Sequence, residues 1–98
     1  MNLKKERKDT SLTVYFDGRL DAVSSPECEQ ALVPELQGIT RLSLDFSKVD
    51  YVSSAGLRLL IYMQQLMEEQ GEMVLTNVPE IVMDTFEVTG CLDFMKIV

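Results

Sequence analysis

The chain has 98 residues, 46% of them hydrophobic, and a formal net charge of −7, which predicts one folded domain over residues 1–98 rather than a disordered chain. This acidity excludes nucleic acid as an expected partner, because binding to phosphates requires a basic face. No apolar run is long enough to span a bilayer and no signal-peptide pattern is present, so we expect a cytoplasmic protein without membrane insertion.

The charge is distributed unevenly along the chain. Residues 9–98 hold five Lys or Arg against fifteen Asp or Glu, whereas the first eight residues are basic, with Lys4, Lys5, Arg7 and Lys8 against Glu6. We interpret the basic start as a solubilising edge strand or tail. The acidic remainder favours a partner with a basic contact surface.

The first residues predict a β-hairpin followed by a loop. Residues 3–7 form a strand candidate, and residues 12–17 alternate between apolar and polar side chains in the manner of a half-buried strand. Gly18 is predicted to end this second strand, and residues 18–21 are predicted to be a loop.

A helix and a strand are predicted next. The helix begins at Ser25, whose hydroxyl suits an N-cap. Pro34 predicts a kink or an early end, because proline removes a backbone hydrogen bond from a helix. Residues 41–46 then alternate as a strand does, and we expect Val49 and Val52 to lie in the loop that follows.

The second half of the chain continues the alternation of helices and strands. A helical pattern covers residues 54–70, a short strand covers 72–76, a helix ends at Gly90, and residues 94–98 predict a last strand. The predicted fold class is therefore α/β: a single domain with a mostly parallel mixed sheet of about five strands, an N-terminal β-hairpin and three helices.

The sequence lacks the common catalytic motifs. It contains no histidine, which removes the Ser-His-Asp arrangement and the commonest zinc ligand. The G-x-S-x-G motif fails because Val52 stands where a glycine would precede Ser54. No glycine-rich phosphate-binding loop occurs. We therefore predict a protein that is not an enzyme and needs no cofactor or metal.

Ser53 and Ser54 stand where a predicted strand gives way to the long helical pattern. A helix start offers unpaired backbone N–H groups and the positive end of the helix dipole, where a phosphate is stable. The hydroxyl of Ser54 can therefore cap the helix or carry a removable phosphate. It can do both only if it reaches solvent.

Three parts of the chain carry a resemblance to a known family. The core of the match is residues 44–60, LDFSKVDYVSSAGLRLL, and it is supported by residues 18–21 and by the pattern of residues 77–90. These segments resemble the STAS domains of bacterial anti-anti-sigma factors, which are also called anti-sigma factor antagonists. The order of the predicted elements agrees with that family over nearly the whole chain.

The resemblance implies a phosphorylation switch. In the family, the serine two residues before the helix-start glycine is phosphorylated, and here that serine is Ser54. The preceding residue is often aspartate in the family and is Ser53 here, which leaves open whether Ser53 also accepts phosphate. Arg58 lies four residues along the same helix face and could pair with the phosphate. The implied contact residues for the partner are Arg19, Asp21, Ser53, Ser54, Gly56 and Arg58.

The partners implied by the resemblance are a serine protein kinase anti-sigma factor and a phosphatase acting on phospho-Ser54. The unphosphorylated protein would bind the kinase and release the sigma factor, and phosphorylation would reverse that binding. One alternative is a regulatory or structural STAS subunit of a transport complex that uses the same helix face without phosphorylation. A second alternative, an enzyme or nucleotide-binding domain, is disfavoured by the missing histidine and phosphate loop.

Overall fold

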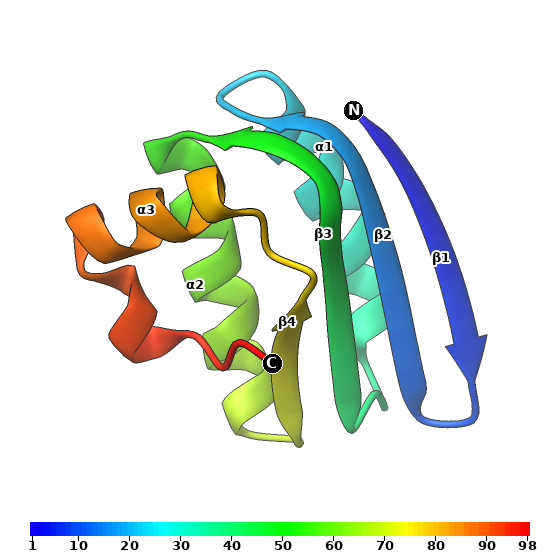
Figure 1. Ribbon diagram of the computed structural model, residues 1–98. Helices are drawn as coiled ribbons and strands as arrows, with labels where there is room; N and C mark the ends of the chain where they lie inside the picture. The colour runs from blue at the N-terminus through cyan, green and yellow to red at the C-terminus, as the bar shows by residue number, and fades with distance from the viewer.

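Four strands form one mixed sheet in the computed structural model of the chain, which describes residues 1–98 (Figure 1). Their order in the sheet is β1 (Asn2–Lys8), β2 (Ser11–Leu20), β3 (Arg41–Val52) and β4 (Glu72–Thr76). β1 and β2 form the predicted antiparallel hairpin, and β2, β3 and β4 run parallel to one another. The predicted α/β fold with a mostly parallel mixed sheet is therefore confirmed.

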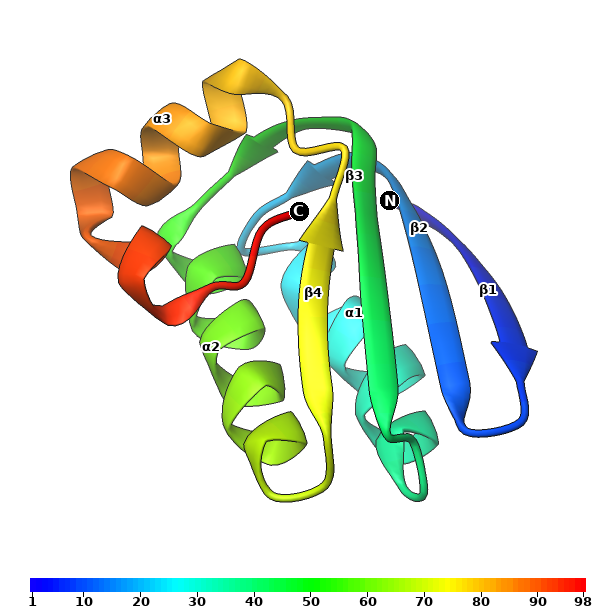
Figure 2. The ribbon, with the colours of Figure 1, turned by 60° about the horizontal axis from the view of Figure 1, so that its bottom comes forward.

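Three helices accompany the sheet: α1 (Ser24–Leu32), α2 (Ser54–Glu68) and α3 (Glu80–Thr89). α1 and α2 lie side by side against the sheet (Figure 2). α3 follows β4 in the chain and packs against β3. Two short 3-10 turns, η1 (Val33–Leu36) and η2 (Cys91–Phe94), follow α1 and α3. None of the helices is long and apolar enough to cross a membrane.

The core is built from the alternating residues of the two central strands. Val14 of β2 and Leu44 of β3 are register partners, and both side chains are fully buried. Three phenylalanine rings extend this core toward α3: Phe16 lies 5.2 Å from Phe46, and Phe46 lies 6.4 Å from Phe86, measured between ring centroids. These edge-to-face and tilted contacts join β2, β3 and α3 into one apolar interior.

The predicted last strand is reduced to a single bridge. Gly90, with φ of 76°, ends α3, and the chain then makes the η2 turn, which includes Phe94. Only the final residues reach β4, where Leu75 pairs in parallel with Ile97. The N–H of Leu75 donates to the carbonyl of Lys96 at 2.8 Å, and that of Val98 donates to Leu75 at 3.0 Å.

Both central strands run further than the sequence pattern predicted. β3 continues to Val52 instead of ending at residue 46, and β2 continues to Leu20, so most of the predicted loop 18–21 is strand. Irregularities in the register between Tyr15 and Leu20 break the simple alternation. Val49 and Val52 are consequently buried strand residues, which the expected period of two does not reveal.

The early end of the helix after β2, which Pro34 predicted, is confirmed. α1 stops at Leu32 and passes into the η1 turn, which contains Pro34. Its start was predicted wrongly, because α1 begins at Ser24 and the hydroxyl of Ser25 is buried without a hydrogen-bond partner. The group that holds the start of α1 is the carboxylate of Asp21.

The first turn of α2 lies directly against the end of β2. A β-carbon built on Gly56 would come within 2.6 Å of the carbonyl oxygen of Leu20 and 2.9 Å of the Leu20 side chain. Real β-carbons do not approach a backbone oxygen this closely. Glycine is therefore required at position 56 so that the helix can start where it does.

Substitution Gly56→Ala should lower the free energy of unfolding by about 1–3 kcal/mol, since the added methyl group must push α2 away from β2. Chemical denaturation monitored by circular dichroism measures this loss. Gly90→Ala is the matched control, because its added carbon meets open space and only its left-handed φ of 76° is unfavourable. We expect that control to cost about 1 kcal/mol. A Gly56→Ala protein as stable as the original would contradict the close approach.

Candidate functional site

The start of α2 is organised by Ser53. Its N–H donates to the carbonyl of Leu20 at 2.9 Å, which ties the end of β3 to the end of β2. Its backbone is extended, its carbonyl accepts from the N–H of Leu57 at 2.9 Å, and its Oγ accepts from the N–H of Gly56 at 3.4 Å. Ser53 is therefore the N-cap of α2, and it is half-buried.

Ser54 is the first residue of α2 and has a different environment. Its side chain is exposed, and its Oγ makes no hydrogen bond within the chain. The interpretation of Ser54 as the helix cap is wrong, because the preceding residue, Ser53, is the N-cap of α2. The Ser54 hydroxyl is thus free to meet another molecule, at a position where the first helical turn supplies N–H groups without intrahelical acceptors.

Asp21 holds the loop that leads from β2 into α1. Its Oδ1 accepts from the backbone N–H groups of Val23 and Ser24, each at 3.0 Å. The backbone hydrogen bond from Ser24 lowers the pKa of the Asp21 carboxyl below its usual value. In return, the N–H of Asp21 donates to the Oγ of Ser24 at 2.9 Å. Asp21 therefore shapes the loop beside the start of α2.

The end of β2 brings this loop and the α2 start together. The Oγ of Ser24 donates to the carbonyl of Arg19 at 2.6 Å, and the next carbonyl along, that of Leu20, accepts from Ser53. The carbonyl of Arg19 thus holds the start of α1, and the carbonyl of Leu20 holds the start of α2. Arg19, Asp21, Ser53 and Ser54 lie in this one region of the fold as a result.

Arg19 is held by an aromatic residue that the sequence reasoning missed. Arg19 and Tyr51 are register partners on β2 and β3, and the guanidinium carbon lies 4.6 Å from the centre of the tyrosine ring. This is a cation–π contact between two exposed side chains. No local pattern marks Tyr51, because the pairing becomes visible only once the register of the two strands is known.

Arg58 lies one turn after Ser54 on α2. Its side chain is exposed and forms no ion pair with a carboxylate of the chain. It lines a groove of about 450 Å³ between α1 and α2. The other lining residues are Ala22, Ser25, Pro26, Glu29, Ala55, Leu59 and Tyr62. Gly56, by contrast, is buried and contributes to the region only through the backbone packing described above.

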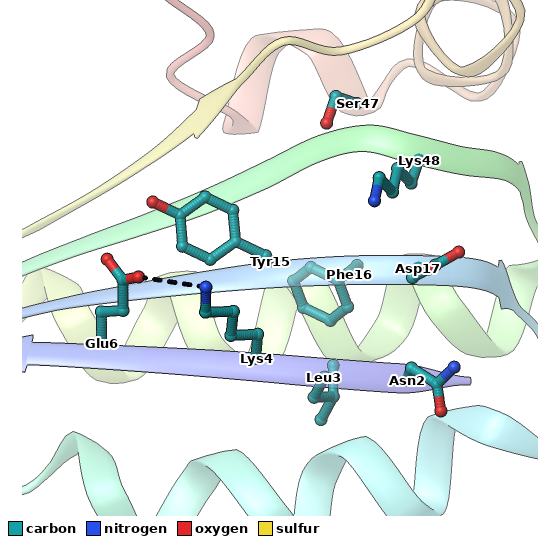
Figure 3. Close-up of a pocket in the computed structure, with 9 residues that line it drawn as sticks. All are labelled: Asn2, Leu3, Lys4, Glu6, Tyr15, Phe16, Asp17, Ser47 and Lys48. Atoms are coloured by element: carbon teal, nitrogen blue, oxygen red, sulfur yellow. Dashed lines mark ion pairs between the residues drawn. The ribbon is translucent and has the colours of Figure 1, made fainter.

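A larger hollow, of about 510 Å³, lies away from these residues (Figure 3). It is formed by β1, β2 and β3, and none of the predicted site residues lines it. Its lining residues are Asn2, Leu3, Lys4, Glu6, Tyr15, Phe16, Asp17, Ser47 and Lys48. The region at the start of α2 is therefore a surface site beside a shallow groove, with no enclosed pocket of its own.

The chain is similar to known regulatory proteins over almost its whole length. The family described as the STAS domain matches residues 2–98. A Bordetella bronchiseptica protein, named "Putative anti-sigma factor antagonist BtrV", is 32% identical over 99 residues, which cover 99% of this chain and 85% of the relative. The anti-sigma-B factor antagonist of Listeria monocytogenes is 30% identical, over 95% of this chain and 83% of its own.

The fold is shared with a solved structure of the same kind. The anti-sigma factor antagonist SpoIIAA in its unphosphorylated form superposes with a TM-score of 0.84 at 17% identity, covering 99% of this chain and 88% of that one. At this identity the likeness concerns the fold alone. The family match and the sequence relatives lead to one conclusion: the chain belongs to the STAS domain family and, within it, to the anti-sigma factor antagonists.

Proposed function

We propose that this protein switches partners through phosphorylation of Ser54. In its unphosphorylated form it binds a serine protein kinase anti-sigma factor and so releases the sigma factor. The kinase transfers phosphate from ATP to Ser54 and ends the complex, and a phosphatase acting on phospho-Ser54 restores the first state. The observation that carries the proposal is the exposed Oγ of Ser54, which makes no hydrogen bond within the chain.

The local geometry favours Ser54 over Ser53 as the acceptor. Ser53 is half-buried and its Oγ already accepts the N–H of Gly56, so phosphorylating it would disturb the existing cap of α2. Modification of Ser54 requires no such loss. The division of labour between the neighbouring serines therefore allows the domain to be modified while α2 keeps its cap.

The added phosphate would be tolerated by the domain itself. It carries about −1.5 to −2 charges at neutral pH and would stand at the positive end of the α2 dipole. Arg58, one turn further on, has no ion pair and can approach it. The effect of phosphorylation must then fall on the partner, because an extra charge in a packed contact is costly to desolvate.

The contact surface proposed for the kinase surrounds Ser54. It comprises the Arg19 and Asp21 loop on one side and the Arg58 groove between α1 and α2 on the other. Val23 and Tyr62 add apolar area to it, with 77% and 43% of their surfaces exposed. No observation favours the transport-subunit alternative, and that alternative remains an outcome of the experiment below.

Incubation with candidate anti-sigma kinases and ATP should add one phosphate, detected as a mass gain and located at Ser54 by fragmentation. Ser54→Ala should accept none. Ser53→Ala should still be labelled, while its free energy of unfolding falls by about 1 kcal/mol through the lost cap. Label retained in Ser54→Ala would overturn the site assignment. An absence of label with every cognate kinase would favour the transport subunit.

Substitution Ser54→Asp should weaken binding to the anti-sigma factor at least tenfold, because it places an added negative charge in the contact, where the charge must be desolvated. Calorimetry measures the affinity. Ser54→Asn is the matched control, since it has nearly the same size without the charge, and it should bind more tightly than the aspartate variant. Both proteins should unfold within about 0.5 kcal/mol of the original. A large loss of stability in Ser54→Asp alone would argue against a purely intermolecular effect.

A further inference from the structure

The two edges of the sheet differ in whether they are covered. At the β4 edge, the backbone of Leu75 is paired with that of Lys96 and Val98. At the other edge, β1 is the outermost strand in both Figure 1 and Figure 2, with no element beyond it. Because β1 pairs with β2 along all seven of its residues, alternate residues point their N–H and C=O groups outward along an open edge.

The open edge is also the basic part of an acidic protein. β1 carries four cations and one carboxylate, while residues 9–98 have a large excess of acids. Lys5 is neutralised by Glu35 at 2.6 Å, and Lys4 lies 3.6 Å from Glu6. Arg7 and Lys8, at the end of the strand, have no ion-pair partner. The strand therefore offers unpaired backbone groups and unpaired positive charges together.

We propose that β1 is a docking edge for an extended acidic segment of a partner protein, which adds a fifth strand to the sheet. The backbone groups of β1 would supply the hydrogen bonds, and acidic side chains on one face of the segment would lie beside Lys8. A second copy of this chain does not fit, because two β1 strands would place like charges side by side. Nucleic acid is disfavoured by the acidic body behind the strand.

The surface beside β1 has room for the side chains of such a segment. Figure 3 shows Lys4 and Glu6 of β1 on the same face as Tyr15 of β2, around the hollow of about 510 Å³. Alternate side chains of an added strand would project over this face. The Lys8 end of this edge lies beside the start of β2, away from the Ser54 region, whereas Asn2 at the other end of β1 lines a hollow together with Arg19 and Asp21.

The proposal is tested with an acetylated, amidated seven-residue peptide of alternating Glu and Val, titrated into the full chain. Amide shifts in a ¹H–¹⁵N spectrum should locate binding on β1, and the outward-facing β1 amides should exchange at least about tenfold more slowly with peptide bound. A peptide in which Pro replaces two central Val residues keeps the charge but cannot form a strand. A third peptide, of alternating Lys and Val, reverses the charge. Neither of these should protect β1.

Substitution Lys8→Glu should weaken binding of the Glu–Val peptide about fivefold, because it turns an attraction across the strands into a repulsion. Lys96→Glu, the same charge change beside the opposite, β4 edge of the sheet, should leave the affinity within about twofold. Equal binding of the proline peptide, or of a single-stranded DNA oligonucleotide, would show a general anion patch and overturn the proposal. The absence of any binding, or shifts located away from β1, would overturn it as well.

Discussion

The close approach between the end of β2 and the first turn of α2 is the contact on which the rest of the site depends. The carbonyl of Leu20 accepts the N–H of Ser53, and only glycine at position 56 lets the helix come this near. Because this contact aligns Ser53 as the cap, the next residue is the first helical one and faces outward. A shift of the helix by one residue would exchange the roles of the two serines.

A polar network then extends the same contact to α1. The carbonyl of Arg19 accepts the Ser24 hydroxyl, and the Asp21 carboxylate accepts two backbone N–H groups. Each of these side chains forms hydrogen bonds with the backbone of the loop, so the loop has its conformation before any partner binds. Preorganisation of this kind reduces the entropy lost on binding. The Asp21 carboxylate is engaged by these two N–H groups within the loop itself.

The alternation of elements and the start of α2 at Ser54 could be read from the sequence, because apolar periodicity and helix-start signals are local. The early end of α1 could also be predicted, because Pro34 acts on the helix turn that contains it. The residue that caps α1 could not be predicted from the sequence. The hydroxyl of Ser25 is a suitable capping group, but in the folded loop it is the Asp21 carboxylate that accepts the N–H groups at the start of the helix. The length of β3 and the pairing of Arg19 with Tyr51 depend on register irregularities, which arise from long-range packing.

The distribution of charge over the fold separates two kinds of surface. The cations of β1 lie at one edge of the sheet, whereas Arg58 stands on α2 next to Ser54, away from that edge. A phosphate at Ser54 would therefore stand on a different element from the β1 cations. The two surfaces meet at the start of β1, because Asn2 shares a hollow with Arg19 and Asp21. A segment bound only at the Lys8 end of β1 would leave the proposed acceptor Ser54 accessible, whereas one that extended to Asn2 would approach Arg19 and Asp21.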